Sequence, residues 1–260
     1  MLITEKPMFY KWTKNILFVI PEYTESAKYY QEIYRPFSQE FDIIIVDWEN
    51  LYHLGKDLKF NDLQEYVLHI IEYLEIDTSK IVFIGSGVGA SIISLIHHYM
   101  NPLGCLFISP IFSTTLVNPY TSNIPSYKNN LNSYFIRMQK EYYKVDEYFG
   151  DRSSSLFTAK FRHYLKYQDF FDTAIAQICL YDSLKAIRKK ETHFCKNTAI
   201  FMGVYDEVVD LSSLIKSYKF KHFKNQVPIL VFEKSSHHIE LEETKLYLKE
   251  LKKYLNEWTK

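Results

Sequence analysis

The sequence predicts an α/β protein with a mostly parallel sheet and helices on both of its faces. Short runs that are apolar throughout alternate with segments of helical periodicity over residues 15–110, and the alternation resumes after residue 192. A strand that is apolar at every position is buried on both faces, as in parallel sheets whose strands are joined through helices. Hydrophobic residues make up 47% of the 260, which suffices for a large core.

The expected strands are short apolar runs bounded by polar residues, proline or glycine. They lie at residues 15–20, 41–47, 81–84, 104–110, 198–203 and 228–232. The segments between them carry helix-start signals or place apolar residues on one helical face. These expected helices lie at residues 26–35, 63–74, 88–101 and 211–218, with an amphipathic closing helix at 241–258.

Between residues 111 and 191 the alternation stops, and the sequence becomes helical in character and rich in tyrosine and phenylalanine. We therefore expect two segments, 1–110 and 192–260, to form one α/β core, with 111–191 inserted as a helical, aromatic-rich cap. Two compatible interpretations of the insertion remain. It buries a small core of its own, or it is a lid whose aromatic side chains line an apolar ligand pocket, since ligand pockets are mostly apolar.

Composition excludes several classes of function. The 31 basic and 31 acidic residues balance, so nothing favours binding to nucleic acid or to an anionic membrane. Cys105, Cys179 and Cys195 are odd in number and lack metal-ligand spacing, which indicates reduced thiols and no metal site. The first residues are too polar for a signal peptide, and no apolar run approaches the ~18 residues of a membrane span. We expect a cytoplasmic protein without a cofactor.

Three of the seven glycines, Gly85, Gly87 and Gly89, stand at alternate positions between an expected strand and an expected helix. Glycine serves where the backbone needs a positive φ or where another group approaches closely. Two motifs fit this turn. Gly85, Gly87 and Ala90 satisfy the dinucleotide fingerprint G-x-G-x-x-G/A. Gly85 and Gly89 are also the outer glycines of the nucleophile elbow G-x-S-x-G, with Gly87 at the serine position.

The next strand argues against the dinucleotide fingerprint. A dinucleotide site places an aspartate or glutamate at the end of that strand to bind the ribose hydroxyl. Here the strand ends in Ile108, Ser109 and Pro110, without an acid. Two expected strands also precede the motif, which usually follows the first strand of its unit. The nucleophile elbow is therefore the preferred interpretation.

An elbow of this kind is followed in chain order by an acid and then by a histidine. Asp206 follows one late strand, and His237 and His238 follow the next, about 31 residues later. With this order and spacing the chain resembles the α/β-hydrolase superfamily along nearly its whole length. The resemblance implies that Asp206 is the acid and His237 the histidine, with His238 as the alternate. It also implies that the aromatic insertion is a helical cap. Taken singly, an Asp that caps a turn and histidines on a surface loop remain an alternative.

The elbow itself is similar to that of the N-myc downstream-regulated (NDR) family, whose turn carries the run reproduced by Gly85, Gly87, Val88, Gly89 and Ala90. The local match spans roughly 30 residues. That family is regarded as non-enzymatic, so the resemblance implies a hydrolase fold with a degenerate triad. The oxyanion loop departs from the superfamily as well.

Hydrolases usually place His-Gly after the first of these strands, where this chain has Pro21, Glu22 and Tyr23. Ser86 is a poor substitute nucleophile, because its flanking residues are bulky and its side chain would point elsewhere. An Asp206–His237 pair would leave one ring nitrogen facing an empty space above Gly87.

The Val88 N–H, with Pro21 and Glu22 beside it, could receive an anionic oxygen there. Two hypotheses follow. The chain is a pseudo-hydrolase that binds an apolar small molecule or a protein partner. Alternatively, it is an enzyme that uses Asp206 and His237 as a general base without serine, for lyase-like chemistry or slow water-mediated hydrolysis.

Overall fold

The structure is a computed structural model of the 260-residue chain. It describes residues 12–23, 27–48, 51, 59–112, 194–206, 209, 211–217 and 227–260. All but the first two residues of the expected cap, 111–191, lie outside the described residues. The proposed division into core and cap therefore stays a prediction.

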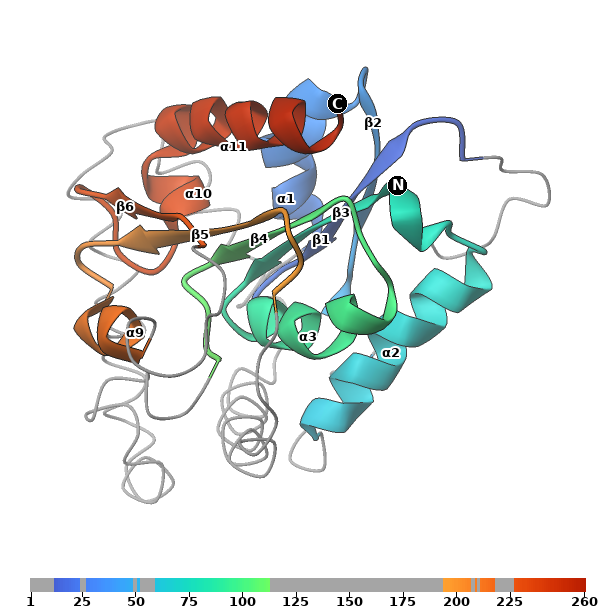
Figure 1. Cartoon of the computed structure of the whole chain (residues 1–260), viewed down its shortest axis with the longest axis horizontal. Coiled ribbons are helices and arrows are strands. Elements are labelled where there is room, and N and C mark those ends of the chain that lie inside the picture. The colour runs from blue at the N-terminus through green and yellow to red at the C-terminus, as the bar shows by residue number, and fades with distance from the viewer. Residues whose placement is uncertain are drawn as a thin grey trace.

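Six parallel strands form a single sheet in the order β2-β1-β3-β4-β5-β6 (Figure 1). The strands are β1 (Asn15–Ile20), β2 (Phe41–Ile45), β3 (Ile81–Ser86), β4 (Gly104–Ile108), β5 (Thr198–Gly203) and β6 (Ile229–Phe232). Every strand expected from the sequence is present, with ends that differ by no more than a few residues. The predicted fold class is confirmed.

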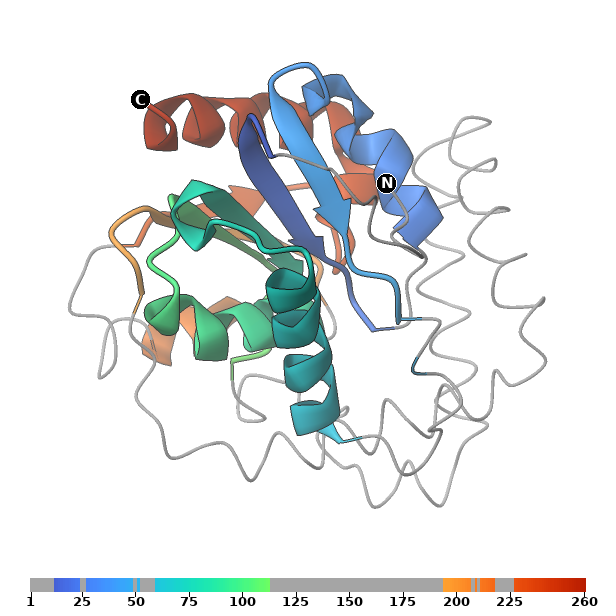
Figure 2. The ribbon, with the colours of Figure 1, turned by 90° about the vertical axis from the view of Figure 1, so that its right-hand side faces the viewer.

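Helices cover both faces of the sheet, as Figures 1 and 2 show. On one face lie α1 (Ala27–Tyr34), α10 (Ile239–Glu242) and α11 (Thr244–Trp258). On the other lie α2 (Phe60–Tyr73), α3 (Val88–Ile96) and α9 (Leu211–Ser217). Short 3-10 turns occur at η1 (Arg35–Phe37), η3 (Thr78–Lys80) and η4 (His97–Tyr99).

The closing helix, expected as one piece from residue 241, is divided at Glu243, whose backbone leaves the helical region with φ −123° and ψ 44°. The Glu243 side chain accepts hydrogen bonds from the Lys234 backbone N–H at 3.1 Å and from the Ser235 hydroxyl at 2.8 Å. These bonds to the preceding loop compete with continuation of the helix.

The sheet separates two hydrophobic clusters, and β1 contributes to both. Ile16, Phe18 and Ile20 belong to the cluster beneath α2 and α3, whereas Leu17 and Val19 belong to the cluster beneath α1 and α11. Successive side chains of a strand point to opposite faces, so burial on both faces requires apolar residues at consecutive positions. This explains why the strands are short apolar runs without polar alternation.

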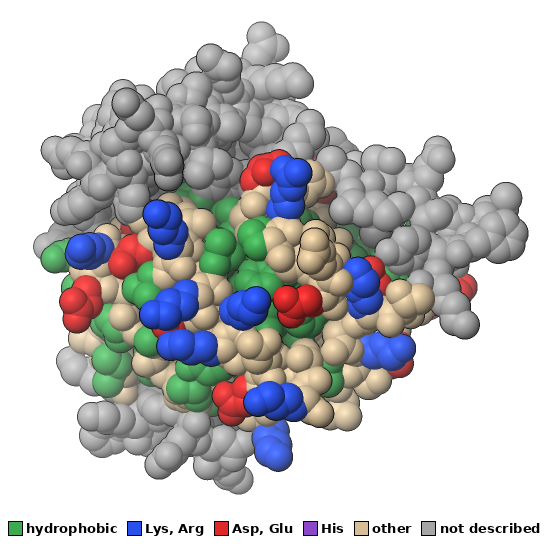
Figure 3. Space-filling view, turned by 90° about the horizontal axis from the view of Figure 1, so that it is seen from above, with side chains coloured by type: hydrophobic (Ala, Val, Ile, Leu, Met, Phe, Trp, Pro, Cys, Tyr) green, Lys and Arg blue, Asp and Glu red, His purple; other side chains and the backbone are tan. Residues whose placement is uncertain are grey.

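The outer face of α11 is polar and mixed in charge. Figure 3 views the molecule from this side and shows basic and acidic side chains interspersed over the described surface. Lys253 pairs with Glu250 at 2.6 Å, and Lys252 pairs with Glu40, which directly precedes β2, at 3.7 Å. Across the described residues, no helix is both long and apolar enough to cross a membrane.

Candidate functional site

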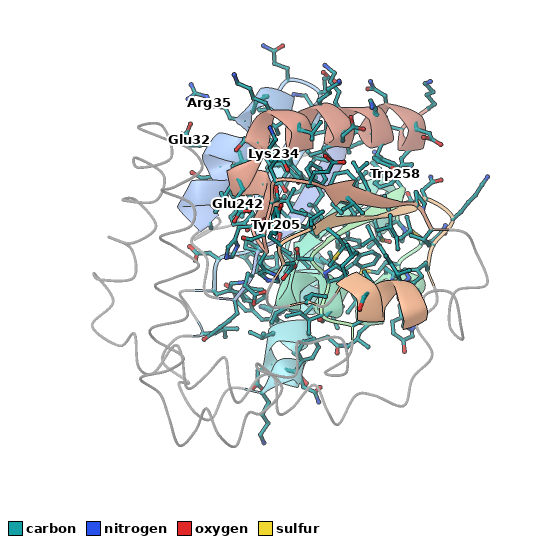
Figure 4. All side chains as sticks on the ribbon, turned by 90° about the vertical axis from the view of Figure 1, so that its left-hand side faces the viewer. Glu32, Arg35, Tyr205, Lys234, Glu242 and Trp258 are labelled. Carbon is teal, nitrogen blue, oxygen red and sulfur yellow. The ribbon has the colours of Figure 1, made fainter. Side chains whose placement is uncertain are left out.

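The predicted site residues meet at one edge of the sheet. From β1 the chain leads to β2 on one side, and from β3 it leads to β4 on the other, so the strand order reverses between β1 and β3. In open α/β sheets, ligands bind beyond the carboxyl ends of the strands at such a reversal. In Figure 4, Glu242 of α10 and Tyr205, which follows β5, lie at the carboxyl end of the sheet, and Trp258 lies at the opposite end.

The turn from β3 to α3 has a glycine at its apex. Gly87 has φ 51° and ψ −110° and stands directly before the first residue of α3. Side-chain-bearing residues adopt this conformation only at a cost in strain. A Cβ on Gly89 would overlap with the carbonyl oxygen of Ile20, so α3 packs closely against the end of β1. Both glycines are therefore required by a sharp strand-to-helix turn.

The structure brings Asp206 and His237 into contact. The Nδ1 atom of His237 lies 3.1 Å from Oδ1 and 3.0 Å from Oδ2 of Asp206. Asp206 Oδ1 also accepts the Val209 N–H at 2.8 Å, which fixes the carboxylate, and the Asp206 side chain is fully buried. His237 is only 7% exposed, so the alternative in which it is a surface loop residue is wrong. His238 lies outside this contact, with its ring packed edge-on against His237.

The space above Gly87 is filled by the carboxylate of Glu22. Glu22 Oε2 accepts the Val88 N–H at 3.0 Å, and Oε1 accepts the N–H of Tyr23 at 3.1 Å. A Cβ on Gly87 would overlap with this Oε2 atom. The expectation of an empty space is therefore wrong: the absence of a side chain at residue 87 makes room for one that reaches in from the end of β1. Glu22 is 3% exposed.

Glu22, His237 and Asp206 form a line of alternating charge. His237 Nε2 lies 3.8 Å from Glu22 Oε2, within ion-pairing range but longer than a hydrogen bond. Burial alone would lower the pKa of His237, but the charges of Asp206 and Glu22 outweigh it and hold that pKa well above its ordinary value. Burial likewise opposes ionisation of Asp206, and His237 outweighs it, so the pKa of Asp206 is lowered. These shifts favour an imidazolium at His237, next to the carboxylate of Asp206.

Ser86 is directed to the other face of the sheet. Its hydroxyl donates to Glu240 Oε1 at 2.9 Å, and the Tyr30 hydroxyl donates to the same oxygen at 2.7 Å. This bond ties the Ser86 hydroxyl to a carboxylate of α10 instead of to His237, as expected for a poor nucleophile. Glu240 is fully buried, and nothing in the sequence pattern of α10 distinguished it from the neighbouring acidic residues.

Pro21, a predicted site residue, and Glu242, which was not predicted, contribute to the surroundings of the site. The carbonyl oxygen of Pro21 accepts the indole N–H of Trp48 at 3.2 Å, so this residue fixes the loop that carries Glu22. Glu242 accepts hydrogen bonds from both the backbone N–H and the hydroxyl of Ser236, and burial raises the pKa of Glu242. Ser236 immediately precedes His237, so these bonds hold the histidine loop in place.

Neither a metal nor a phosphate fits this arrangement well. Among the described residues, no group of three or more His, Cys, Asp or Glu side chains is placed to hold a metal ion. A pyrophosphate on the N-terminus of α3 would have to share the Val88 N–H with the Glu22 carboxylate. The resulting repulsion is a third argument against a dinucleotide site.

No protein-family profile matches the sequence, and no curated protein matches it. Several solved structures, however, are similar to this chain in fold. A hydrolase from Oleispira antarctica superimposes with a TM-score of 0.67 at 11% identity, covering 94% of this chain and 91% of that one. An esterase from Rhodococcus sp. ECU1013 gives 0.65 at 13% identity, with 94% and 90% covered. The epoxide hydrolase of Bacillus megaterium gives 0.59 at 12% identity, with 95% of each chain covered.

The chain has the α/β-hydrolase fold. Identities this low establish the fold alone, so the narrower resemblance to the NDR family stays a prediction. The assignment of Gly87 to the position of the nucleophile, and of Asp206 and His237 to those of the acid and the histidine, likewise stays a prediction from the sequence.

Proposed function

We propose that this chain is a pseudo-hydrolase, whose site binds a ligand and does not turn it over. The observation that supports the proposal is the carboxylate of Glu22, which fills the space above Gly87 and accepts the Val88 N–H. In the α/β-hydrolase fold, the N–H of the residue after the nucleophile is one of the donors to the oxyanion. Glu22 therefore blocks the nucleophile position and the oxyanion donor at once.

Acyl-transfer chemistry needs three things that are missing here. The apex of the elbow carries no hydroxyl, because residue 87 is glycine. The donor that would stabilise the oxyanion is already bonded to a carboxylate. The histidine must be neutral to accept a proton, but Asp206 and Glu22 raise the pKa of His237 and so favour its protonated form. Loss of the nucleophile alone lowers the rate of a triad protease by about 10⁶-fold.

The proposed ligand is an apolar small molecule or a protein partner, within a cytoplasmic setting. The proposal rests on the sequence of segment 111–191, in which tyrosine and phenylalanine recur as in a lid over an apolar pocket. The resemblance of the elbow to the non-enzymatic NDR family points in the same direction. Segment 113–193 lies outside the described residues, so this part of the proposal stands on sequence.

A serine-directed fluorophosphonate probe tests the proposal. We expect no labelling of the wild-type chain and no hydrolysis of p-nitrophenyl esters. Gly87→Ser alone should stay unlabelled, because Glu22 occupies the space that the new side chain needs. The double variant Gly87→Ser/Glu22→Ala should become labelled, since it restores a hydroxyl beside His237 and frees the Val88 N–H. Ester turnover by the wild type that His237→Gln abolishes would contradict the proposal.

The hydrogen bonds between Asp206 and His237 keep one enzymatic alternative open, because they orient the ring as in a general base. That base requires a neutral imidazole. Turnover through it should therefore rise with pH through the raised pKa of His237, and it should increase when Glu22 is replaced by alanine. A rate that neither rises with pH nor depends on Glu22 would exclude this alternative.

A further inference from the structure

The group that occupies the site indicates which chemistry the site accepts. Glu22 contributes a single carboxylate, which lies against the N-terminus of α3 and faces the ring of His237. We infer that this site binds the carboxylate head of an apolar monocarboxylic acid, which takes the place of the Glu22 side chain. The inference rests on the proposed binding function and names the class of its ligand.

Without Glu22, the remaining groups of the site favour a small anion over a neutral or cationic group. The Asp206 carboxylate and the His237 imidazolium cancel each other, and the helix N-terminus adds a partial positive charge with the Val88 N–H as donor. His237 is 7% exposed, and its Nε2 atom lies 3.8 Å from Glu22 Oε2, so this atom faces the position of the carboxylate. Two donors therefore point at the same small volume. One is the Val88 N–H at the β3–α3 turn, and the other is the Nε2–H of His237 on the histidine loop.

Glu22 satisfies these donors incompletely. Its Oε2 atom bonds to the Val88 N–H at 3.0 Å but stays 3.8 Å from His237 Nε2, beyond hydrogen-bond length. Its other oxygen bonds to the N–H of Tyr23, next to it in the chain. A carboxylate that is not tethered to this loop can place one oxygen on Val88 and the other on His237. Exchange of the two carboxylates conserves the buried charge and gains a charge-assisted hydrogen bond.

The charge and the surroundings favour an apolar monoanion. A phosphate in place of the Glu22 carboxylate would add a second negative charge to a buried site that still holds the Asp206 carboxylate, at a high desolvation cost. The neighbouring side chains Tyr23, Trp48 and Val88 are fully buried, and the first two rings pack together at 6.1 Å. Such apolar surroundings disfavour a ligand that carries further polar or charged groups next to its carboxylate.

Titration calorimetry of the full chain with octanoate, and with octanamide as its neutral match, tests the inference. We expect wild type to bind octanoate and not octanamide. The affinity should rise about fourfold with each methylene from hexanoate to octanoate. Glu22→Ala removes the internal competitor, so octanoate should bind at least tenfold more tightly to this variant. Glu32→Ala, at an exposed position of α1, is the matched control and should behave like wild type.

Equal binding of octanoate and octanamide, or equal affinities in Glu22→Ala and Glu32→Ala, would overturn the inference. If Glu22→Ala fails to fold, Glu22→Gln provides a milder comparison: its amide still occupies the site but lacks the charge that pairs with His237, so octanoate should still bind more tightly to it than to Glu32→Ala. His237→Gln should abolish the preference for acid over amide, and a preference that survives would also overturn the inference. Ester turnover by wild type would refute the proposed function, whereas absent turnover together with absent acid binding would refute only the inference.

Discussion

The order of charges in the site predicts that removal of its central cation destabilises the chain more than removal of its outer anion. His237 lies between two buried carboxylates, 3.0 Å from Asp206 and 3.8 Å from Glu22. His237→Gln leaves both carboxylates buried without a counterion. Glu22→Gln leaves the Asp206–His237 pair complete, and its amide oxygen can still accept the Val88 N–H.

Breaking a buried ion pair by removing one partner costs about 3–5 kcal/mol, so His237→Gln should lower the free energy of unfolding by that amount. For a chain of this size it should lower the melting temperature by roughly 6–20 °C. Glu22→Gln loses only a long ion pair and should cost about 1 kcal/mol or less. The two variants should therefore differ by at least ~2 kcal/mol.

Urea unfolding at pH 7, followed by tryptophan fluorescence and far-UV circular dichroism, measures both values. His238→Gln is the matched control, because it removes a neighbouring histidine that lies outside the contact with Asp206, and it should cost under about 0.5 kcal/mol. If His237→Gln were no more destabilising than Glu22→Gln, the histidine would not be a buried cation. The electrostatic description of the site would then be refuted.

Three other outcomes follow from the same structure. Because the pKa of His237 is raised on folding, its contribution is complete below the unfolded value of about 6.5 and is lost as pH rises through the folded pKa. Between these two pKa values, the free energy of unfolding should fall by up to about 1.4 kcal/mol per pH unit, and in His237→Gln this dependence on pH should be much weaker. Gly87→Ala should lower the free energy of unfolding by about 2–5 kcal/mol, because residue 87 has a positive φ and a Cβ there would overlap with Glu22. The loss should be clearly smaller in a Glu22→Ala background. Equal losses in the two backgrounds would show that Glu22 does not fill this space. A hydrogen bond with Cys105 lowers the pKa of Cys195 to about 7, so iodoacetamide labelling of Cys195, read by mass spectrometry, should have its midpoint there; an ordinary midpoint of about 8.5 would contradict this.

The strands of the sheet could be predicted from the sequence because the signal for each strand is local. Each strand buried on both faces is a short apolar run, and β1 and β5 have the bounds that the sequence indicates. The Asp206–His237 contact was also expected, since the fold places the ends of neighbouring strands at one edge of the sheet. Two residues 31 positions apart meet there without any local signal other than their places after β5 and β6.

The function of Glu22 could not be predicted in the same way. Its bond to Val88 joins residues 66 positions apart and depends on how the loop after β1 turns. The sequence marked Glu22 as a departure from the usual oxyanion loop, but not the direction of its side chain. The hydrogen bonds of Ser86 and Tyr30 to Glu240 were missed for the same reason, because side-chain direction across the sheet is set by packing and not by periodicity.

The glycine at residue 87 and the carboxylate of Glu22 depend on each other, because Glu22 fills the space that a side chain at residue 87 would need. In serine hydrolases, the state with an anion on the oxyanion donors, an imidazolium and an ionised aspartate forms only during reaction. Here Glu22 on the Val88 N–H, Asp206, and His237, whose raised pKa favours the protonated form, hold a similar charge distribution without a substrate. Under the proposed function, a site preorganised for a transient anion holds a stable anion instead, which is why that proposal and the inferred affinity for carboxylates predict absent turnover and acid binding together.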